Sequence, residues 1–395
     1  MFQKRISSPL TITGTTLLFL IIFPLIVNAQ KLAAPFKVIG HWGYVTSENV
    51  VLIKPQFVKL VLTDELHLAD NDGRSMIGEF SEGMVRFSDG DKWGFYDSLG
   101  NIAVSAQFEA AKDFSDSLAA VRPKDKWGFI NKKGEWIIQP AFDKIKNFEN
   151  GIAIVKINDL WGYIDKNGSW IIKPQYKNAL PFKNNLAAVE TEFGWGYINR
   201  DGHFVIKAQF NVAYNFKNEY ARVEAHGGFG FIDTTGNYII KPEYGYAADF
   251  CYGVARTRDN LTWTYVDTKG NRIEQYNFMS AEDFTDSVAR FEKLELWGYL
   301  KRDGSFLLNP QYGYADDFIN GMARVRTPKG WMFIDKKGNN CFGEITFKHV
   351  ENFSNGYACA NKGGGWGFIN TKGEWAIKPF YDIVKDFVNV YETKY

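Results

Sequence analysis

The sequence predicts an all-β protein built as a tandem array of ten units. Three observations support this prediction: aromatic residues recur every 34 residues, a turn closed by glycine follows most of them, and aromatic residues make up 16% of the chain. With 37 glycines and only 12 prolines, the composition is typical of many short strands joined by tight turns. The 46 basic and 45 acidic residues nearly balance, which argues against a nucleic-acid binder.

Residues 1–29 have the pattern of an export signal. Lys4 and Arg5 precede an apolar stretch, Leu17 to Val27, and the small residue Ala29 follows it. The stretch is shorter than the ~20 apolar residues that a membrane span needs, which favours cleavage after Ala29 over a retained anchor. We therefore expect an exported mature chain that is periplasmic, cell-surface or extracellular and has no membrane span.

Residues 30–395 are predicted to form one repeat array. The aromatic positions stand 34 apart and then once 35 apart, at Trp93, Trp127, Trp161, Trp195, Phe229, Trp263, Trp297, Trp331 and Trp366. Trp42 precedes this series by one period plus 17 residues, so an insertion lies at about 58–78. Counting Trp42, the array has ten repeats.

Each repeat is predicted to contain three short antiparallel strands. In the repeat that begins at Trp127, strands over 127–131 and 135–139 are joined by a type I turn with a G1 bulge, in which Asn131 caps the turn and Gly134 takes a positive φ. A short 3₁₀ or α turn then leads to the third strand, 151–155.

Neighbouring units must stack, because one unit cannot bury its own aromatic face. Two arrangements are possible: a superhelical β-solenoid with free ends, or a closed β-propeller. Ten three-stranded blades exceed the usual four to eight blades of four strands, so the open superhelical solenoid is favoured. Residues 31–39 then form a half-unit at one end, and the polar residues 390–395 form a cap at the other.

The unit Trp-Gly-(Phe/Tyr)-Ile-(Asp/Asn)-x-x-Gly resembles the bacterial WG-repeat family. Clear matches begin at Trp93, Trp127, Trp161, Trp195, Trp297 and Trp366, and three repeats depart, with Phe229-Gly230, Trp263-Thr264 and Trp331-Met332. The hairpin pattern is also similar to the aromatic-rich cell-wall-binding repeats of secreted bacterial proteins. The resemblance implies a β-repeat fold and a scaffold role, and it brings no catalytic residues.

Two aromatic columns supply the candidate binding residues. The first is the series that begins at Trp42 and Trp93, and the second lies across the first hairpin from it, at Trp136, Trp170, Phe204, Tyr238, Phe306 and Trp375. They suit either core packing or an exposed row of stacking platforms for a repeating glycan. The candidates are Trp93, Trp127, Trp136, Trp161, Trp170, Trp195, Trp297, Trp366 and Trp375. A surface repeated every 34 residues offers the same weak contact many times, so we expect a polymer or a protein as the ligand.

No catalytic, cofactor or metal site is predicted. The five histidines fall at different phases of the repeat, and residues 70–73 resemble a calcium-loop fragment that lacks the required glutamate. A Cys341–Cys359 disulfide is one alternative, and isolated thiols are favoured over it. The favoured function is a non-catalytic exported scaffold that binds a protein or a cell-envelope polymer. The alternatives are a carbohydrate-recognition protein with exposed aromatic rows and, less favoured, a propeller-type enzyme.

Overall fold

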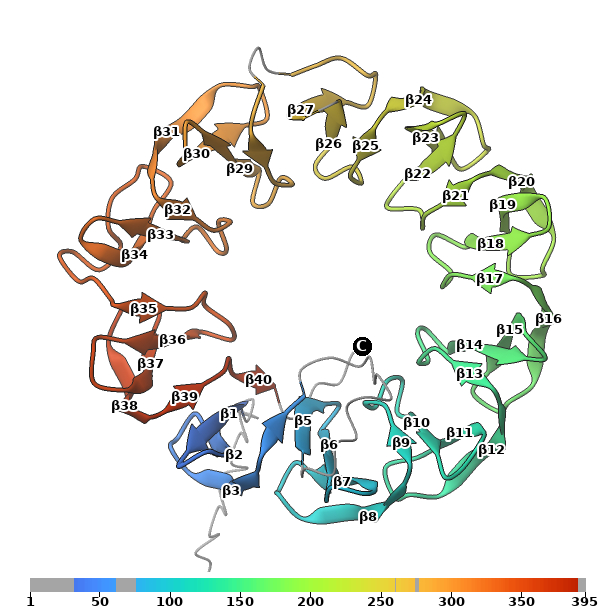
Figure 1. The fold of residues 1–395 in the computed structure, drawn as a ribbon, viewed down its shortest axis with the longest axis horizontal. Helices are drawn as coiled ribbons and strands as arrows, with labels where there is room; N and C mark the ends of the chain where they lie inside the picture. Colours follow the sequence, from blue (N-terminus) through green and yellow to red (C-terminus); the bar gives the residue numbers. More distant parts are fainter. Residues whose placement is uncertain (1–31, 62–75, 260, 274–276, 390–395) are drawn as a thin grey trace, which may run out of the picture.

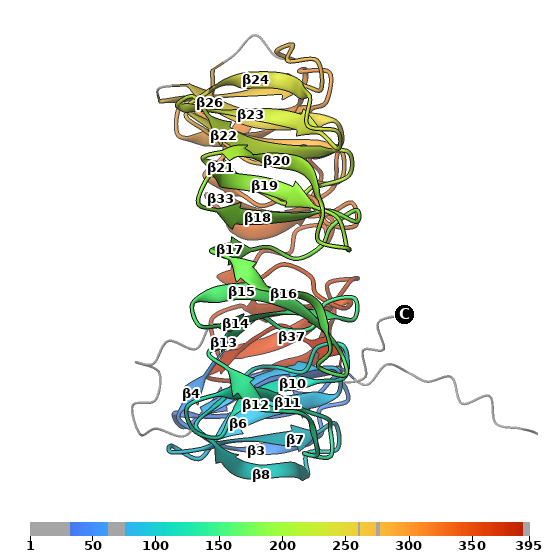
Figure 2. The ribbon, with the colours of Figure 1, turned by 90° about the vertical axis from the view of Figure 1, so that its right-hand side faces the viewer.

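The computed structural model describes residues 32–61, 76–259, 261–273 and 277–389, which form ten sheets arranged as the blades of a closed ring (Figure 1). Seen edge-on, the strands run across the thickness of the ring (Figure 2). These residues contain strands, turns and links and no helix. We number the blades 1 to 10 in chain order of their third strands, with β2 in blade 1.

The second and third strands of all ten blades, and the outer strands of eight of them, are found at equivalent places around the ring. The second strands are β1 (Leu32–Val38), β6 (Met84–Ser88), β10 (Ala119–Arg122), β14 (Ile152–Ile157), β18 (Ala187–Thr191), β22 (Tyr220–Ala225), β26 (Val254–Asp259), β29 (Val288–Lys293), β33 (Ala323–Thr327) and β36 (Tyr357–Asn361). The third strands are β2 (His41–Thr46), β7 (Trp93–Asp97), β11 (Trp127–Ile130), β15 (Leu160–Asp165), β19 (Gly194–Ile198), β23 (Gly228–Asp233), β27 (Thr262–Asp267), β30 (Leu296–Lys301), β34 (Gly330–Ile334) and β37 (Trp366–Asn370). The outer strands are β3 (Val51–Phe57), β8 (Ile102–Phe108), β12 (Trp136–Phe142), β16 (Trp170–Tyr176), β20 (Phe204–Phe210), β24 (Tyr238–Tyr244), β31 (Phe306–Tyr312) and β38 (Trp375–Tyr381).

The link after each outer strand is a fourth, innermost strand, so the predicted unit of three strands with a 3₁₀ or α turn is wrong. For example, β12 leads directly into Lys144 and Ile145, which pair with β14 of the next blade. The innermost strands are β9 (Ala110–Ala111), β13 (Lys144–Ile145), β17 (Asn178–Ala179), β21 (Val212–Ala213), β25 (Tyr246–Ala247), β28 (Ser280–Ala281), β32 (Tyr314–Ala315) and β35 (His349–Val350). A repeat that starts at a tryptophan therefore spans two blades.

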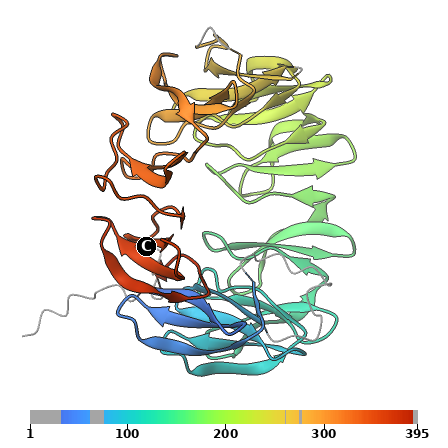
Figure 3. The same cartoon turned by 60° about the vertical axis from the view of Figure 1, so that its left-hand side comes forward.

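The ring is closed, which contradicts the predicted open solenoid. Two short strands near the end of the described chain, β39 (Ile383–Val384) and β40 (Val388–Asn389), pair antiparallel with β1 of blade 1. Blade 10 accordingly lies beside blade 1 (Figure 3). The physical reason is the offset between repeat and blade: blade 1 begins at its second strand, and the last repeat supplies the missing innermost strand. Within the predicted half-unit, residues 32–38 form β1, while residue 31 and the predicted cap, 390–395, lie outside the described residues.

One aromatic contact recurs at each of the ten blade interfaces in the described part of the ring. The aromatic side chain two residues after the tryptophan position packs on a phenylalanine of the next blade, with the centroids of the two aromatic rings 4.3 to 5.2 Å apart. The pairs are Tyr44–Phe80, Phe95–Phe114, Phe129–Phe148, Tyr163–Phe182, Tyr197–Phe216, Phe231–Phe250, Tyr265–Phe284, Tyr299–Phe318, Phe333–Phe353 and Phe368–Phe387. Because every interface uses the same contact, equal steps around the ring bring the last blade back to the first.

The glycine after each tryptophan lets the outer strand approach the third strand closely. A Cβ added to Gly128 would lie 2.6 Å from the carbonyl oxygen of Ile138, at the point where the register of β11 and β12 shifts. Blades 7 and 9 carry Thr264 and Met332 in this place. In the described residues of these two blades, the outer segment meets the third strand through isolated bridges, such as Trp263 with Phe278 and Trp331 with Phe347. Over these described residues, the absence of the glycine therefore accompanies a less regular pairing of the outer segment.

The predicted turn chemistry between third and outer strands is confirmed. The carboxylate of Asp165 accepts hydrogen bonds from the backbone N–H groups of Asn167 and Ser169, both within 2.9 Å. Gly168 has a φ of 82° and closes the turn through its own N–H to the Asp165 carbonyl. The carboxylate of Asp165 therefore caps this turn.

The insertion enters blade 2 at its innermost edge. There, β4 (Lys59–Leu60) pairs in parallel with β5 (Met76–Ser81), which takes the innermost place beside β6. The hydroxyl of Tyr44 donates to the carbonyl of Gly78, whereas the equivalent Tyr163 donates to Leu180, only 17 residues away. The repeat therefore resumes in register at β5. The calcium-loop fragment at residues 70–73 lies outside the described residues.

Candidate functional site

The first tryptophan column points into the blade interfaces. Trp93 and Trp195 are buried, at 1% and 8% exposure. Trp127, Trp161, Trp297 and Trp366 are half-buried and pack against hydrophobic clusters. Cationic side chains cover several of these rings: Arg122 lies 5.5 Å from the ring centre of Trp127, and Arg290 lies 5.3 Å from that of Trp297. This column therefore offers no exposed row of rings.

The second column lies on the outer strands, at the perimeter of the ring (Figure 1). Two members of this column, Trp136 and Trp375, are half-buried. Three others are partly exposed: Trp170 on blade 4 at 37%, Phe204 on blade 5 at 42% and Tyr238 on blade 6 at 38%. Each of these three rings packs edge-on against an aromatic ring at the end of the preceding outer strand, as Trp170 does on Phe142 at 6.2 Å. Because this packing holds the rings in place, they form a rigid row along three neighbouring blades.

A groove opens beside the middle of this row, between blades 4 and 5. It has a volume of about 460 Å³ and is lined by Gln175, Tyr176, Thr191, Glu192, Phe193, Phe204, Lys207 and Ala208. Phe193 is 76% exposed at the tip of the turn between β18 and β19. The Thr191 hydroxyl accepts from the Phe193 N–H and donates to the Gly194 carbonyl, which fixes the turn. The groove thus combines aromatic walls with amide, hydroxyl, carboxylate and ammonium groups.

Sequence reasoning missed Phe193, because it lies outside both aromatic columns. A signal was nevertheless present. The turn before the third strand contains polar residues or glycine in most repeats, as in Asp89 to Lys92 or His226-Gly227, whereas blade 5 places a large aromatic residue there. We call Trp170, Phe193, Phe204, Tyr238 and the groove lining together the aromatic rim.

A second feature, a set of arginine clamps, ties neighbouring blades together. In the described part of the ring, five arginines occupy the same place on second strands: Arg86, Arg222, Arg256, Arg290 and Arg324. Arg290 shows the pattern, since it donates to the Ala315 carbonyl of the next blade at 2.7 Å and pairs with Asp317 at 2.9 Å. Each arginine therefore ties its own second strand to the innermost strand of the following blade.

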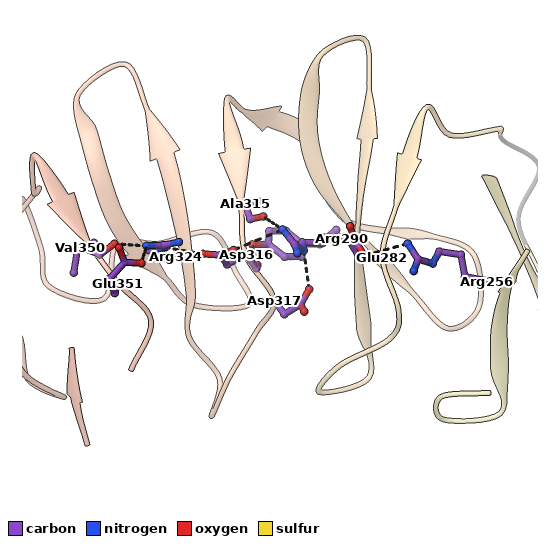
Figure 4. A network of polar contacts seen from close by, with 10 residues as sticks. Arg256, Glu282, Arg290, Ala315, Asp316, Asp317, Arg324, Val350 and Glu351 are labelled. Atoms are coloured by element: carbon purple, nitrogen blue, oxygen red, sulfur yellow. Dashed lines mark hydrogen bonds and ion pairs between the residues drawn. The ribbon is translucent and has the colours of Figure 1, made fainter. Parts of the chain in front are cut away.

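Asp316 joins two clamps into a continuous series of ion pairs (Figure 4). Its carboxylate lies 3.6 Å from Nη1 of Arg290 and 2.6 Å from Nε of Arg324. Burial raises the pKa of Asp317 above its ordinary value, and the guanidinium of Arg290 opposes this rise. The guanidinium groups of Arg290 and Arg324 each have two carboxylate partners, so neither cation is left without an ion pair, which suits a structural clamp.

The arginine and its acid are replaced together on blades 3, 4 and 5. The arginine place holds Ala120, Ile154 and Ala188, and the acid place on the following blades holds Asn147, Pro181 and Asn215. Sequence reasoning missed this clamp, although an arginine followed 27 residues later by an acid, as in Arg290 and Asp317, is a signal for it.

Among the described residues, no group of three or more His, Cys, Asp and Glu side chains is placed to hold a metal ion. The described histidines, His41, His203, His226 and His349, lie on different blades, and His67 lies outside the described residues. Cys251, Cys341 and Cys359 are free thiols. Over the same described ranges, no helix has the length and apolar content needed to cross a membrane.

The fold and its repeated interfaces define a closed β-propeller built from a WG motif. The family model of the WG containing repeat matches eight segments of this chain: 93–127, 127–161, 161–192, 195–228, 229–260, 297–327, 331–366 and 366–389. These segments span more than half of the chain, so the protein belongs to the WG-repeat family, as its sequence motifs predict. No curated protein matches the chain.

Solved structures show distant similarities. A eukaryotic initiation factor is 10% identical with a TM-score of 0.47, and the match covers 78% of this chain and 94% of that chain. Hsv2p of Kluyveromyces lactis is 12% identical with a TM-score of 0.35, covering 56% and 91%. The dihydro-heme d1 dehydrogenase NirN is 12% identical with a TM-score of 0.39, covering 92% and 75%. These TM-scores lie below 0.5, so the similarities carry no argument about function.

Proposed function

We propose that this protein is a non-catalytic binding scaffold, exported to the bacterial envelope, that holds an envelope polysaccharide along its aromatic rim. The observation that supports this proposal most directly is the row of Trp170, Phe204 and Tyr238, which are partly exposed at the same place on three neighbouring blades. Equivalent places on successive blades present one kind of contact at regular intervals, which suits a polymer with a repeating unit.

The chemistry of the groove supports a carbohydrate rather than an apolar ligand. The rings of Phe193 and Phe204 offer apolar surface to the C–H face of a sugar, and the side chains of Glu192 and Lys207 offer hydrogen bonds to hydroxyl groups. The site is shallow and open, and its polar groups come from surface strands and a turn. Such a surface suits binding without chemical conversion of the ligand.

The experiment that tests this proposal is retention of the protein on isolated cell-wall polysaccharide. The triple variant Trp170→Ala, Phe204→Ala and Tyr238→Ala should lose retention, because stacking on aromatic rings is the main contact. The matched control is Ile102→Ala, since Ile102 occupies the same place on blade 2 and is 57% exposed. Retention of the triple variant equal to that of the control would contradict the proposal.

A further inference from the structure

The three outer strands that carry the exposed rings of the aromatic rim also carry a lysine at one shared place. It stands three residues after the ring, at Lys173 on β16, Lys207 on β20 and Lys241 on β24. Three residues of an extended strand span about 10 Å, so these lysines form a second row that runs beside the row of rings. We call Lys173, Lys207 and Lys241 the lysine row.

The side chains of the lysine row are exposed and have no acidic partner. Other lysines of the ring are paired: Nζ of Lys156 lies 3.1 Å from a carboxylate oxygen of Asp159, and Nζ of Lys336 lies 3.2 Å from one of Asp286. Across the described residues, no member of the lysine row makes an ion pair or donates a side-chain hydrogen bond. The three ammonium groups are therefore available to an external anion.

The outer strands of blades 4, 5 and 6 carry more positive than negative charge. Together, β16, β20 and β24 contain the three lysines and one acid, Glu243. By contrast, β8, β12 and β31 contain no charged residue. Lysine returns at this place on blades 1 and 10, where the ring place holds Val51 and the half-buried Trp375. Among the eight described outer strands, an exposed aromatic ring at this place and a lysine three residues later therefore occur together on three neighbouring blades.

The groove between blades 4 and 5 brings the two rows together. Phe204 and Lys207 both line it, so one ring and one ammonium group face the same cavity. A sugar that stacks on Phe204 can therefore present a carboxylate or phosphate group to Lys207. Glu192 is the one acid among the lining residues. Its carboxylate suits a sugar hydroxyl and opposes a polymer with charge at every position.

We infer that the polysaccharide held by the aromatic rim is anionic, with carboxylate or phosphate groups at regular intervals that pair with the lysine row. This inference rests on the proposed function and narrows the class of its ligand. One exposed ion pair contributes little, but the same pair repeated on three blades adds up along one polymer. A nucleic acid fits less well, because the chain has 46 basic and 45 acidic residues and the groove contains Glu192.

Binding to two matched pairs of immobilised polymers tests the inference. The pairs are polygalacturonate with its methyl ester, and dextran phosphate with dextran, so each pair shares a backbone and differs in charge. The wild-type protein should bind at least one charged polymer about tenfold more tightly than its neutral counterpart. The pair that shows the preference identifies the recognised group as carboxylate or phosphate. Added salt should reduce the preference, because it screens exposed charges.

The triple variant Lys173→Gln, Lys207→Gln and Lys241→Gln should lose the preference and keep the wild-type affinity for the neutral polymer. The same three positions changed to arginine should keep the preference, because the charge is kept. The matched control removes three exposed lysines from blades 1, 9 and 10, across the ring from the lysine row (Figure 1). This control is the triple variant Lys54→Gln, Lys329→Gln and Lys372→Gln, and it should behave like the wild type.

The outcomes separate this inference from the proposed function. Equal binding of charged and neutral polymers by the wild type, with loss of both in the aromatic triple variant, would overturn the inference and leave the proposed function standing. Polyglutamate or single-stranded DNA bound as tightly as the charged polysaccharides would also overturn the inference, since the rings would then select no sugar. Absence of binding to all four polysaccharides would do the same, whereas the proposed function fails only when cell-wall polysaccharide is not retained.

Discussion

The rings of Phe368 and Phe387 pack with their centroids 4.3 Å apart, and this contact joins blade 10 to the closing segment of blade 1. It repeats the contact between Phe129 and Phe148 at 4.7 Å in the middle of the chain. The seam of the ring is therefore built like any other interface, although it connects the two ends of the described chain.

The seam should accordingly contribute to stability as much as an internal interface. Phe387→Ala removes a buried ring and should lower the free energy of unfolding by about 3–5 kcal/mol, as Phe148→Ala should. Urea unfolding followed by tryptophan fluorescence measures both values. A near-zero effect of Phe387→Ala beside a large effect of Phe148→Ala would show that the chain end is frayed and the ring open.

The glycine after tryptophan should not tolerate the residue found in blade 7. In Gly128→Thr, the new Cβ would lie 2.6 Å from the Ile138 carbonyl, so the outer strand of blade 3 must move away. We expect a loss of about 1–3 kcal/mol in the free energy of unfolding and faster hydrogen exchange in β12. The control is Gly364→Thr, where no atom lies within 4 Å of the added Cβ. Equal losses in the two variants would refute the close-approach explanation.

The arginine clamp predicts a strong coupling between two positions. Arg290→Ala leaves Asp317 partly buried without its guanidinium partner, and should lower the free energy of unfolding by about 1.5–3 kcal/mol. Adding Asp317→Asn should restore part of this loss, because it reproduces the pair of Ala120 and Asn147 that the chain itself uses at blade 3. A double-mutant cycle measures the coupling, and additive effects of the two substitutions would show that the ion pair is not the clamp.

Stability should depend on pH through Glu79. Burial and the nearby carboxylate of Asp386 raise its pKa above the ordinary value of 4.5, while Lys385 opposes this rise. A carboxyl group with a raised folded-state pKa stabilises the fold most at low pH, and this stabilisation is lost as the pH rises from 4.5 through the raised value.

Glu79→Gln should therefore unfold at a higher urea concentration than the wild type above that window, and its midpoint should fall less as the pH rises. The matched control is Glu48→Gln, which makes the same substitution at an exposed position. Parallel profiles for Glu79→Gln and the wild type would exclude Glu79 as the titrating group.

The sequence by itself determined the repeat, its register and its turns. The 34-residue spacing from Trp93 is read directly along the chain. The capping Asp165 and the positive-φ Gly168 act through neighbours within a few residues. The same spacing identified the WG-repeat family and located the insertion. An insertion lengthens the distance between two successive tryptophan positions in the sequence, whatever its place in the fold.

Only the tertiary structure decided closure and exposure. A period of 34 residues says nothing about the angle between neighbouring blades, which follows from how rings such as Phe129 and Phe148 pack across an interface. The sum of ten such steps determines whether the ends meet, and here β1 meets β39. Exposure also depends on neighbours distant in sequence: Trp93 and Trp170 are both candidates by spacing, yet one is buried at a blade interface and the other lies on the rim.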